Sequence, residues 1–169
     1  MEAHPDVTYV YNEAYDQTNT SKSLLKALRN SHENGVLWLN GDVVFDARVL
    51  ERINDRIENE KSFVCVNTAA VGEEEVKYTV DAKGFIKALS KKVENALGEA
   101  VGINFISKHH KAPVIEQLHA CADNDYFERG LELAIESADI EIEPVDISDL
   151  FAVEVDFQAD LDRANSQIN

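Results

Sequence analysis

Two carboxylates stand directly after short apolar segments, and their positions predict a metal site. Asp42 comes soon after the apolar run 36–39, and Asp156 follows the β-type segment 152–155. In open α/β sheets, ligands bind outside the carboxyl ends of the strands. Mg²⁺ prefers carboxylate and phosphate oxygens, so Asp42 and Asp156 together could hold one or two such ions. Phosphoryl and nucleotidyl transfer need metals of this kind to neutralise charge on the reacting phosphate.

Each segment also has a purely structural interpretation. Asn40-Gly41-Asp42 is a common turn sequence. Asp156 precedes a predicted helix and could simply cap it. Gly41 would serve either purpose, because a glycine also lets a phosphate or sugar approach the backbone closely. The functional interpretation therefore depends on the two carboxylates meeting in space.

The elements that would position these residues alternate between short apolar runs and amphipathic helical stretches. Strands are predicted over 7–11, 36–39, 63–66, 101–106, 140–145 and 152–155, a hairpin over 75–80 and 85–89, and helices over 21–30, 109–120, 125–137, from near 46 and from near 158. Gly84 would supply the positive φ of the hairpin turn. In the helix that begins near residue 46, an inward-facing stripe is predicted from Val49, Leu50, Ile53 and Ile57. This order predicts an α/β fold, a three-layer α/β/α sandwich around a mixed, mainly parallel sheet, as one domain over 1–169.

The composition limits the possible partners. Sixteen Lys and Arg stand against thirty-two Asp and Glu, a formal net charge of −16. Such a surface repels nucleic acids and anionic membranes, so we expect neither as a partner. Cys65 and Cys121 lack a CxxC partner and are predicted to be reduced and buried, which indicates a cytoplasmic location. No apolar run approaches the length of a membrane span.

An ordered series of short motifs resembles the sugar-phosphate and phosphocholine-type nucleotidyltransferases of the glycosyltransferase-A-like fold. The resemblance extends from residue 7 to residue 164, and its motifs are Leu39–Asp46, Glu75–Lys77, Ser90–Lys92, Gly98–Ile103, Asn124–Glu128 and Val153–Asp156. It implies Mg²⁺-dependent transfer of a nucleotidyl group, CMP from CTP being favoured, with release of pyrophosphate. The implied acceptor is a choline-phosphate-like or sugar-phosphate molecule.

The resemblance also implies catalytic roles for three matched residues. Asp42 would be the first metal ligand and Asp156 the second. Lys91 or its neighbour Lys92 would contact the acceptor phosphate, for which a lysine is a suitable point charge. For both lysines, a solvated turn after a strand is an equally good explanation.

Further residues would bind substrate by the same resemblance. Asn40 and Gly41 precede the first metal ligand, and Lys92 follows the central hairpin. Glu99 and Gly102 would also bind the acceptor, with Glu99 facing its sugar or its amine. A solvated position explains Glu99 equally well.

One departure from the resemblance predicts an incomplete site. Members of that family open with a strand and a Gly-rich loop that carries an Arg, followed by a Pro-Lys pair, and these groups bind the phosphates of the nucleotide. Here residues 1–6 lead directly into the segment 7–11, and the seven glycines are scattered. The sequence therefore predicts a domain that lacks its first strand–loop–helix unit. A longer gene or another chain would supply that unit, or else the chain is a binding or regulatory module that no longer transfers nucleotides. Because a lost strand leaves an open sheet edge, we expect a homo-oligomer or a partner chain.

Overall fold

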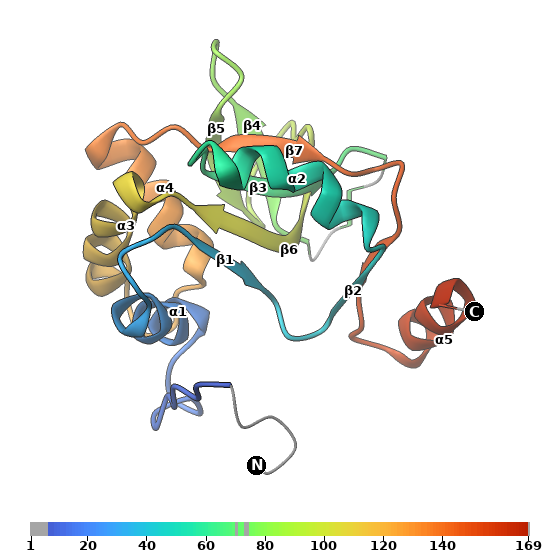
Figure 1. Ribbon diagram of the computed structural model, residues 1–169, viewed down its shortest axis with the longest axis horizontal. Coiled ribbons are helices and arrows are strands. Elements are labelled where there is room, and N and C mark those ends of the chain that lie inside the picture. Colours follow the sequence, from blue (N-terminus) through green and yellow to red (C-terminus); the bar gives the residue numbers. More distant parts are fainter. Residues whose placement is uncertain (1–6, 70, 73–74, 169) are drawn as a thin grey trace.

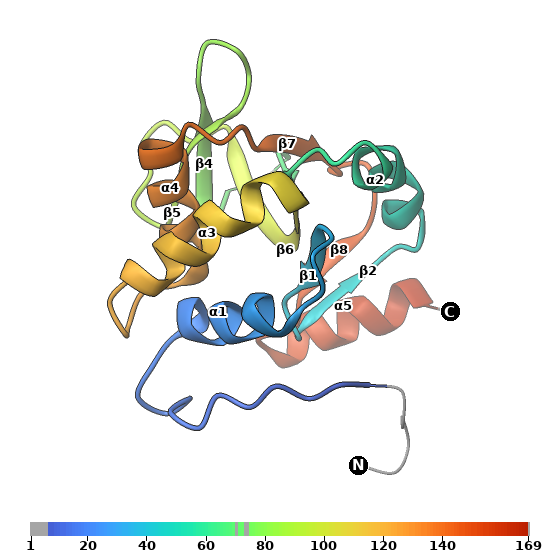
Figure 2. The same cartoon turned by 60° about the vertical axis from the view of Figure 1, so that its left-hand side comes forward.

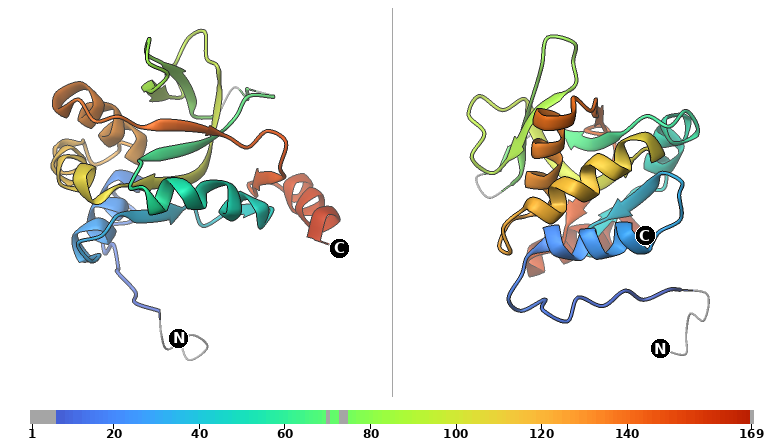
Figure 3. Two further views of the ribbon diagram at one scale, coloured as in Figure 1. Left: turned by 45° about the horizontal axis from the view of Figure 1, so that its top comes forward. Right: turned by 90° about the vertical axis from the view of Figure 1, so that its left-hand side faces the viewer.

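The computed structural model describes residues 7–69, 71–72 and 75–168. Its elements follow one another as α1 (Thr20–Asn30), β1 (Val36–Leu39), β2 (Val43–Phe45), α2 (Arg48–Glu58), β3 (Phe63–Asn67), β4 (Lys77–Val80), β5 (Ile86–Ser90), β6 (Gly98–Ile106), α3 (Lys108–Ala120), α4 (Phe127–Ala138), β7 (Glu143–Asp146), β8 (Ala152–Glu154) and α5 (Gln158–Ile168). A six-stranded sheet lies between α1, α3 and α4 on one face and α2 on the other (Figure 1). The view onto the three-helix face is the right-hand panel of Figure 3.

The sheet is mixed, and its central strand runs against most of the others. The strand order is β5-β4-β6-β3-β7, and β1 also pairs with β6. β1, β3 and β4 are each antiparallel to β6, while β7 is parallel to β3, so these four strands share one direction. The predicted α/β class with a mixed sheet is confirmed. Neighbouring strands nevertheless pair mostly antiparallel, because β6 lies between strands that run the other way.

Strand β3 shows why two hydrophobic cores form. Successive side chains of a strand point to opposite faces of the sheet. Val64 and Val66 pack in the core beneath α1, α3 and α4, whereas Phe63 and Cys65 pack in the core beneath α2. The nearly unbroken apolar run therefore fills both faces. Cys65 is a free, buried thiol, as predicted, and so is Cys121.

Two predictions about local structure are wrong. The segment from Val7 to Tyr11 is not a strand, and its side chains are exposed, with Tyr11 at 61%. A β-type composition does not form a strand without cross-strand pairing, and none of the described strands pairs with this segment. Leu50 does not face inward but is 45% exposed, because the buried stripe of α2 follows the i, i+4 spacing of Val49 and Ile53.

A second, two-stranded sheet packs against β6 of the main sheet. β2, which the sequence does not predict, pairs antiparallel with β8, and Val43 stands opposite Glu154. We call this pair the β2–β8 ribbon. Figure 2 shows α5 beside it. None of the helices in the described part of the chain is long and apolar enough to cross a membrane.

Candidate functional site

The β2–β8 ribbon brings the two predicted metal carboxylates together. Asp42 immediately precedes β2, Asp156 follows β8 after one residue, and the two strands run antiparallel. The backbone N–H of Val155 donates to the carbonyl oxygen of Asp42 at 2.9 Å. Both aspartates line one cavity of ≈ 260 Å³, which we call the Asp42 cavity. Their backbone segments lie side by side across the ribbon, and not at the edge of the main sheet as expected, because β8 pairs with β2 alone.

The Asp42 cavity is lined by residues from distant parts of the chain and is strongly acidic. The polar and charged lining residues are Thr20, Asn40, Asp42, Glu75, Lys91, Tyr126, Glu128, Glu154 and Asp156. Five of them are carboxylates, and Lys91 is the one cation among the described residues of the lining. Such a cavity attracts cations, and an anionic ligand needs a cation to accompany it.

A hydrogen-bonded corner fixes the chain next to Asp42. The side-chain amide of Asn40 donates to Oε1 of Glu154 at 2.9 Å, and the N–H of Asn40 donates to the carbonyl oxygen of Gly102 at 2.8 Å. Gly102 has φ +67, and a Cβ there would lie 2.7 Å from Oε1 of Glu154 and 2.8 Å from Nδ2 of Asn40. Only glycine fits both the conformation and the space. Asn40 and Gly102, which we predicted to bind substrate, thus form part of the cavity wall.

Replacing Gly102 with alanine should destabilise the protein and displace this corner. We expect a loss of about 1–2 kcal/mol from the positive φ alone, with a further loss from the contact with Glu154. Gly84→Ala is the matched control, since Gly84 has φ +90 but a Cβ there would meet nothing within 4 Å. Urea unfolding of both variants measures the difference. Equal losses in the free energy of unfolding for the two variants would show that the residues around Gly102 can make room for a Cβ without cost.

Burial raises the pKa of three carboxyls that line the cavity. For Glu154 the main cause is desolvation, partly offset by the hydrogen bond from Asn40 and reinforced by the charge of Asp42. Desolvation also raises the pKa of Glu75, with the charge of Glu99 adding to it. Desolvation raises the pKa of Glu128 from 4.5 to about 7. Carboxyls crowded into one partly dry space are a common mark of a functional site.

These three glutamates were missed by the sequence prediction. Glu154 lies two residues before Asp156 on an alternating strand, so its spacing placed both on one face and could have indicated it. Glu75 and Glu128 stand within matched motifs, but no local pattern marks them as buried. Their burial depends on packing between elements far apart in the sequence.

The structure separates the two predicted lysines. Lys91 lines the Asp42 cavity, with its Nζ 5.4 Å from the centroid of the Tyr126 ring. Lys92 is not among the lining residues of that cavity. It lines an adjoining cavity of ≈ 390 Å³, which also contains Lys91, Tyr126 and Glu128.

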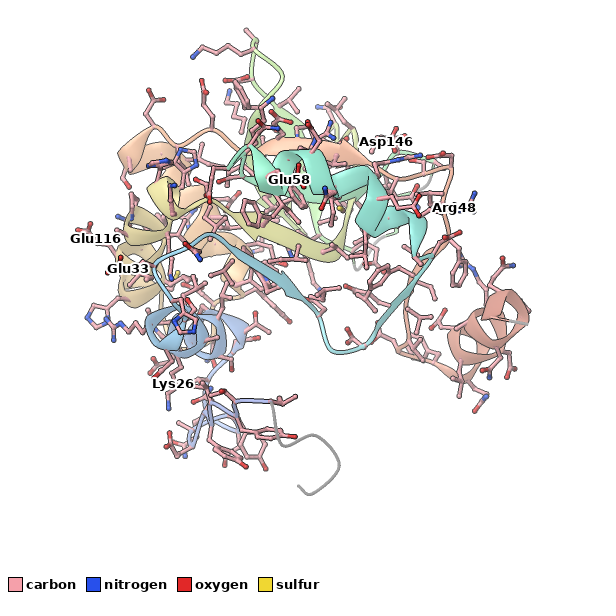
Figure 4. All side chains as sticks on the ribbon, in the orientation of Figure 1. Lys26, Glu33, Arg48, Glu58, Glu116 and Asp146 are labelled. Atoms are coloured by element: carbon pink, nitrogen blue, oxygen red, sulfur yellow. The ribbon has the colours of Figure 1, made fainter. Side chains whose placement is uncertain are left out.

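The other predicted site residues lie outside the Asp42 cavity. Glu99 lines a different adjoining cavity of ≈ 270 Å³, and its Oε2 accepts from the N–H of Gly72 at 2.9 Å. Gly41 is not among the lining residues, and a Cβ there would meet nothing within 4 Å. A third strand-end carboxylate, Asp146, lies near the start of α2, where Arg48 stands (Figure 4). Its backbone carbonyl oxygen accepts a hydrogen bond from the side chain of Arg52.

The donor set of the Asp42 cavity fits magnesium. The described residues contain no group of three or more His, Cys, Asp and Glu side chains able to hold a metal. Zinc would need such a group, whereas Mg²⁺ is usually held by one or two carboxylates together with waters and substrate phosphates. Asp42 and Asp156 supply that pair of carboxylates. A magnesium ion here would share its ligands with the substrate.

The family of the chain follows from its sequence. Residues 1–125 match the family model described as the MobA-like NTP transferase domain. The chain belongs to this family. The matched segment covers most of the chain and includes Asn40, Asp42 and Lys91. No curated protein matches the chain in sequence.

Solved structures share the fold of this NTP transferase domain. The inositol-1-phosphate CTP transferase from T. maritima superposes with a TM-score of 0.73 at 14% identity, over 93% of this chain and 64% of that one. A putative glucose-1-phosphate thymidylyltransferase from Bacillus anthracis gives 0.69 at 12% identity, over 90% and 62%. CTP:phosphocholine cytidylyltransferase from Streptococcus pneumoniae gives 0.69 at 12% identity, over 96% and 69%. The chain thus spans less than two thirds of the length of the first two structures.

Proposed function

We propose that this NTP transferase domain transfers a nucleotidyl group, CMP from CTP in the first place, to a phosphorylated small molecule in a Mg²⁺-dependent reaction. The observation that carries the proposal is that Asp42 and Asp156 line one cavity together with Lys91. The family match supports nucleotidyl transfer. The preference for CTP draws on the resemblance to CTP-using enzymes, two of which have similar folds.

The proposed reaction is an in-line displacement at the α-phosphorus of the nucleotide. An oxygen of the acceptor phosphate forms the new P–O bond while the bond between the α-phosphorus and the bridging oxygen breaks, and pyrophosphate leaves. Lys91 would hold the acceptor phosphate as a point charge. Asp42 and Asp156 would hold Mg²⁺, which when bound neutralises charge on the reacting phosphates. The hydrogen bond between Asn40 and Glu154 keeps the turn before Asp42 in place.

The acceptor belongs to one of two classes in this proposal, a choline-phosphate-like or a sugar phosphate. Carboxylates along the cavity suit either class, because they accept hydrogen bonds from sugar hydroxyls and attract an organic cation. Both classes carry the phosphate that Lys91 would hold. The cytoplasmic location expected from Cys65 and Cys121 is also part of the proposal.

A second candidate function is a binding or regulatory module. It is favoured by the single lysine among the described residues of the lining, since a triphosphate needs several cationic or N–H partners. Such a module would bind the acceptor and not transfer a nucleotide.

Pyrophosphate release distinguishes the two candidates. The full chain is incubated with Mg²⁺, each of CTP, UTP, GTP and ATP, and either choline phosphate or a sugar 1-phosphate. Acceptor-dependent release that is fastest with CTP supports the cytidylyl transfer we propose. Specific acceptor binding without any release supports the binding module instead.

Lys91 and Lys92 should differ in their effect on the acceptor. We expect Lys91→Met to raise the KM for the acceptor phosphate by about 10- to 150-fold, since a hydrogen bond to a charged group contributes about 1.5–3 kcal/mol. Lys92→Met should change it less than threefold, because Lys92 lines only the adjoining cavity. Steady-state kinetics, or acceptor binding by calorimetry, measures both. A larger effect of Lys92→Met would indicate that Lys92, and not Lys91, binds the acceptor phosphate.

A dimer or a partner chain also remains a prediction. β1 pairs with β6 and with no other strand in the described part of the chain. An unpaired strand edge can add a strand from another chain. Size-exclusion chromatography with light scattering should give a mass above that of one chain, and a strict monomer would count against this expectation.

A further inference from the structure

Glu128 places an unpartnered oxygen at the junction of two cavities. It stands in the first turn of α4 and is only 8% exposed. Its Oε2 is buried and has no hydrogen-bond partner among the described residues. The same residue lines the Asp42 cavity and the adjoining ≈ 390 Å³ cavity.

A buried carboxyl oxygen of this kind calls for a hydrogen-bond donor. Buried polar atoms in folded proteins are nearly always paired, because an unpaired one loses its hydration without compensation. Lys91 lines the same two cavities as Glu128. A ligand whose phosphate lies at Lys91 could therefore present a donor group to Glu128. This arrangement describes a small phosphate ester with a donor at its other end.

The charge of the cavity indicates which donor. Five carboxylates and one lysine make the lining strongly negative, which favours an ammonium group over a neutral hydroxyl. A quaternary ammonium carries no N–H and would leave Oε2 of Glu128 unpaired. It is also best recognised by a cage of aromatic faces. Tyr126 is the half-exposed aromatic ring of the lining, whereas Phe127 is buried edge-to-face against Trp38.

We propose that Glu128 binds a primary ammonium group of the acceptor, so that the acceptor is the phosphate monoester of a primary amino alcohol. Glu128 is then a specificity-determining residue, with Lys91 on the phosphate and Glu128 on the amine. This proposal rests on the proposed function insofar as the bound molecule is the acceptor of nucleotidyl transfer. It narrows the acceptor, since it disfavours both a sugar phosphate and choline phosphate.

Calorimetry with three simple phosphates tests the proposal. The probes are 2-aminoethyl phosphate, its N-trimethyl analogue choline phosphate, and 2-hydroxyethyl phosphate, each titrated into the full chain with Mg²⁺. We expect 2-aminoethyl phosphate to bind at least tenfold more tightly than the other two. Glu128→Gln should weaken its binding about tenfold and reduce the preference over choline phosphate to less than threefold.

Glu136→Gln is the matched control. Glu136 lies two turns further along α4, with its side chain 60% exposed and near Arg129 at 4.0 Å, and it lines neither cavity. Its replacement should leave all three affinities unchanged. Circular dichroism establishes that Glu128→Gln is folded, and if it is not, the preference of the wild-type chain among the three phosphates still decides.

Several results would overturn the proposal. They are equal or tighter binding of choline phosphate, an unchanged preference in Glu128→Gln, or binding of none of the three phosphates. The titrations contain no nucleotide, so their outcome is separate from pyrophosphate release. A Glu128-dependent preference without pyrophosphate release would support the amine site while rejecting the transfer reaction.

Discussion

Replacing Asp42 with asparagine should lower kcat/KM for nucleotidyl transfer by about 10³-fold, the scale on which removal of one preorganised electrostatic group acts. Asp42 lines the same cavity as Asp156 and Lys91, and an amide is a weak ligand for Mg²⁺ compared with a carboxylate. Asparagine keeps the size of the side chain, so the loss would report the charge. Pyrophosphate release, measured over a range of CTP and acceptor concentrations, gives this ratio.

Asp55→Asn is the control for this substitution. Asp55 lies exposed on α2, where it accepts a hydrogen bond from Asn59, and its replacement should leave the rate unchanged. The free energy of unfolding of Asp42→Asn should change by less than about 0.5 kcal/mol, as for other surface substitutions. If Asp42→Asn kept the wild-type rate, Asp42 would have no part in the reaction. A variant that unfolds would show that the loss of rate has a structural cause.

Glu128 should make the protein less stable as the pH rises through the range from about 4.5 to about 7. Burial raises the pKa of its carboxyl from 4.5 to about 7, so the folded state binds the proton more tightly than the unfolded state. Stability from this group is therefore fully present below pH 4.5 and is lost as the pH rises through 7. At about 1.4 kcal/mol for each pKa unit, the loss is about 3 kcal/mol.

Glu128→Gln isolates this effect from other titrating groups, such as Glu75, Glu154 and His110. We expect the variant to be more stable than the wild type by about 3 kcal/mol at pH 8 and nearly equal to it at pH 4. Urea unfolding at several pH values between 4 and 8 measures the difference. A constant difference across this range would mean that the pKa of Glu128 is close to its ordinary value. Glu136→Gln, on the exposed face of the same helix, should follow the wild type.

Much of the fold could be predicted because its elements carry their own periodicity. The stripe of Leu24, Leu25 and Leu28 marks α1, and all three side chains are buried. The run 63–66 marks a strand that is buried on both faces. β2 could not be predicted in this way, because three residues show no period and the strand exists only through its pairing with β8.

The sequence predicts the site residues that a local pattern marks. It does not predict those whose place in the site depends on packing. Asp42 and Asp156 were found from their places after apolar runs, yet the ribbon that joins them was not foreseen. The sequence left Lys91 and Lys92 as alternatives, and only the folded structure shows that Lys91 lines the Asp42 cavity. The sequence around Glu128 is that of an ordinary glutamate in the first turn of a helix. Its burial depends on neighbours from distant elements.

Metal binding tests the central claim, that Asp42 and Asp156 act as one site, most directly. Mn²⁺ in place of Mg²⁺ can be titrated into the full chain with CTP and 2-aminoethyl phosphate and followed by electron paramagnetic resonance, for the wild type, Asp42→Asn, Asp156→Asn and the double variant. If the two carboxylates share a metal, each single variant should lose at least tenfold in Mn²⁺ affinity, and the double variant should lose little more. Two results would contradict the claim of a shared site. One is that the losses in binding free energy of the two single variants add up in the double variant, and the other is that the single variants bind Mn²⁺ as the wild type does.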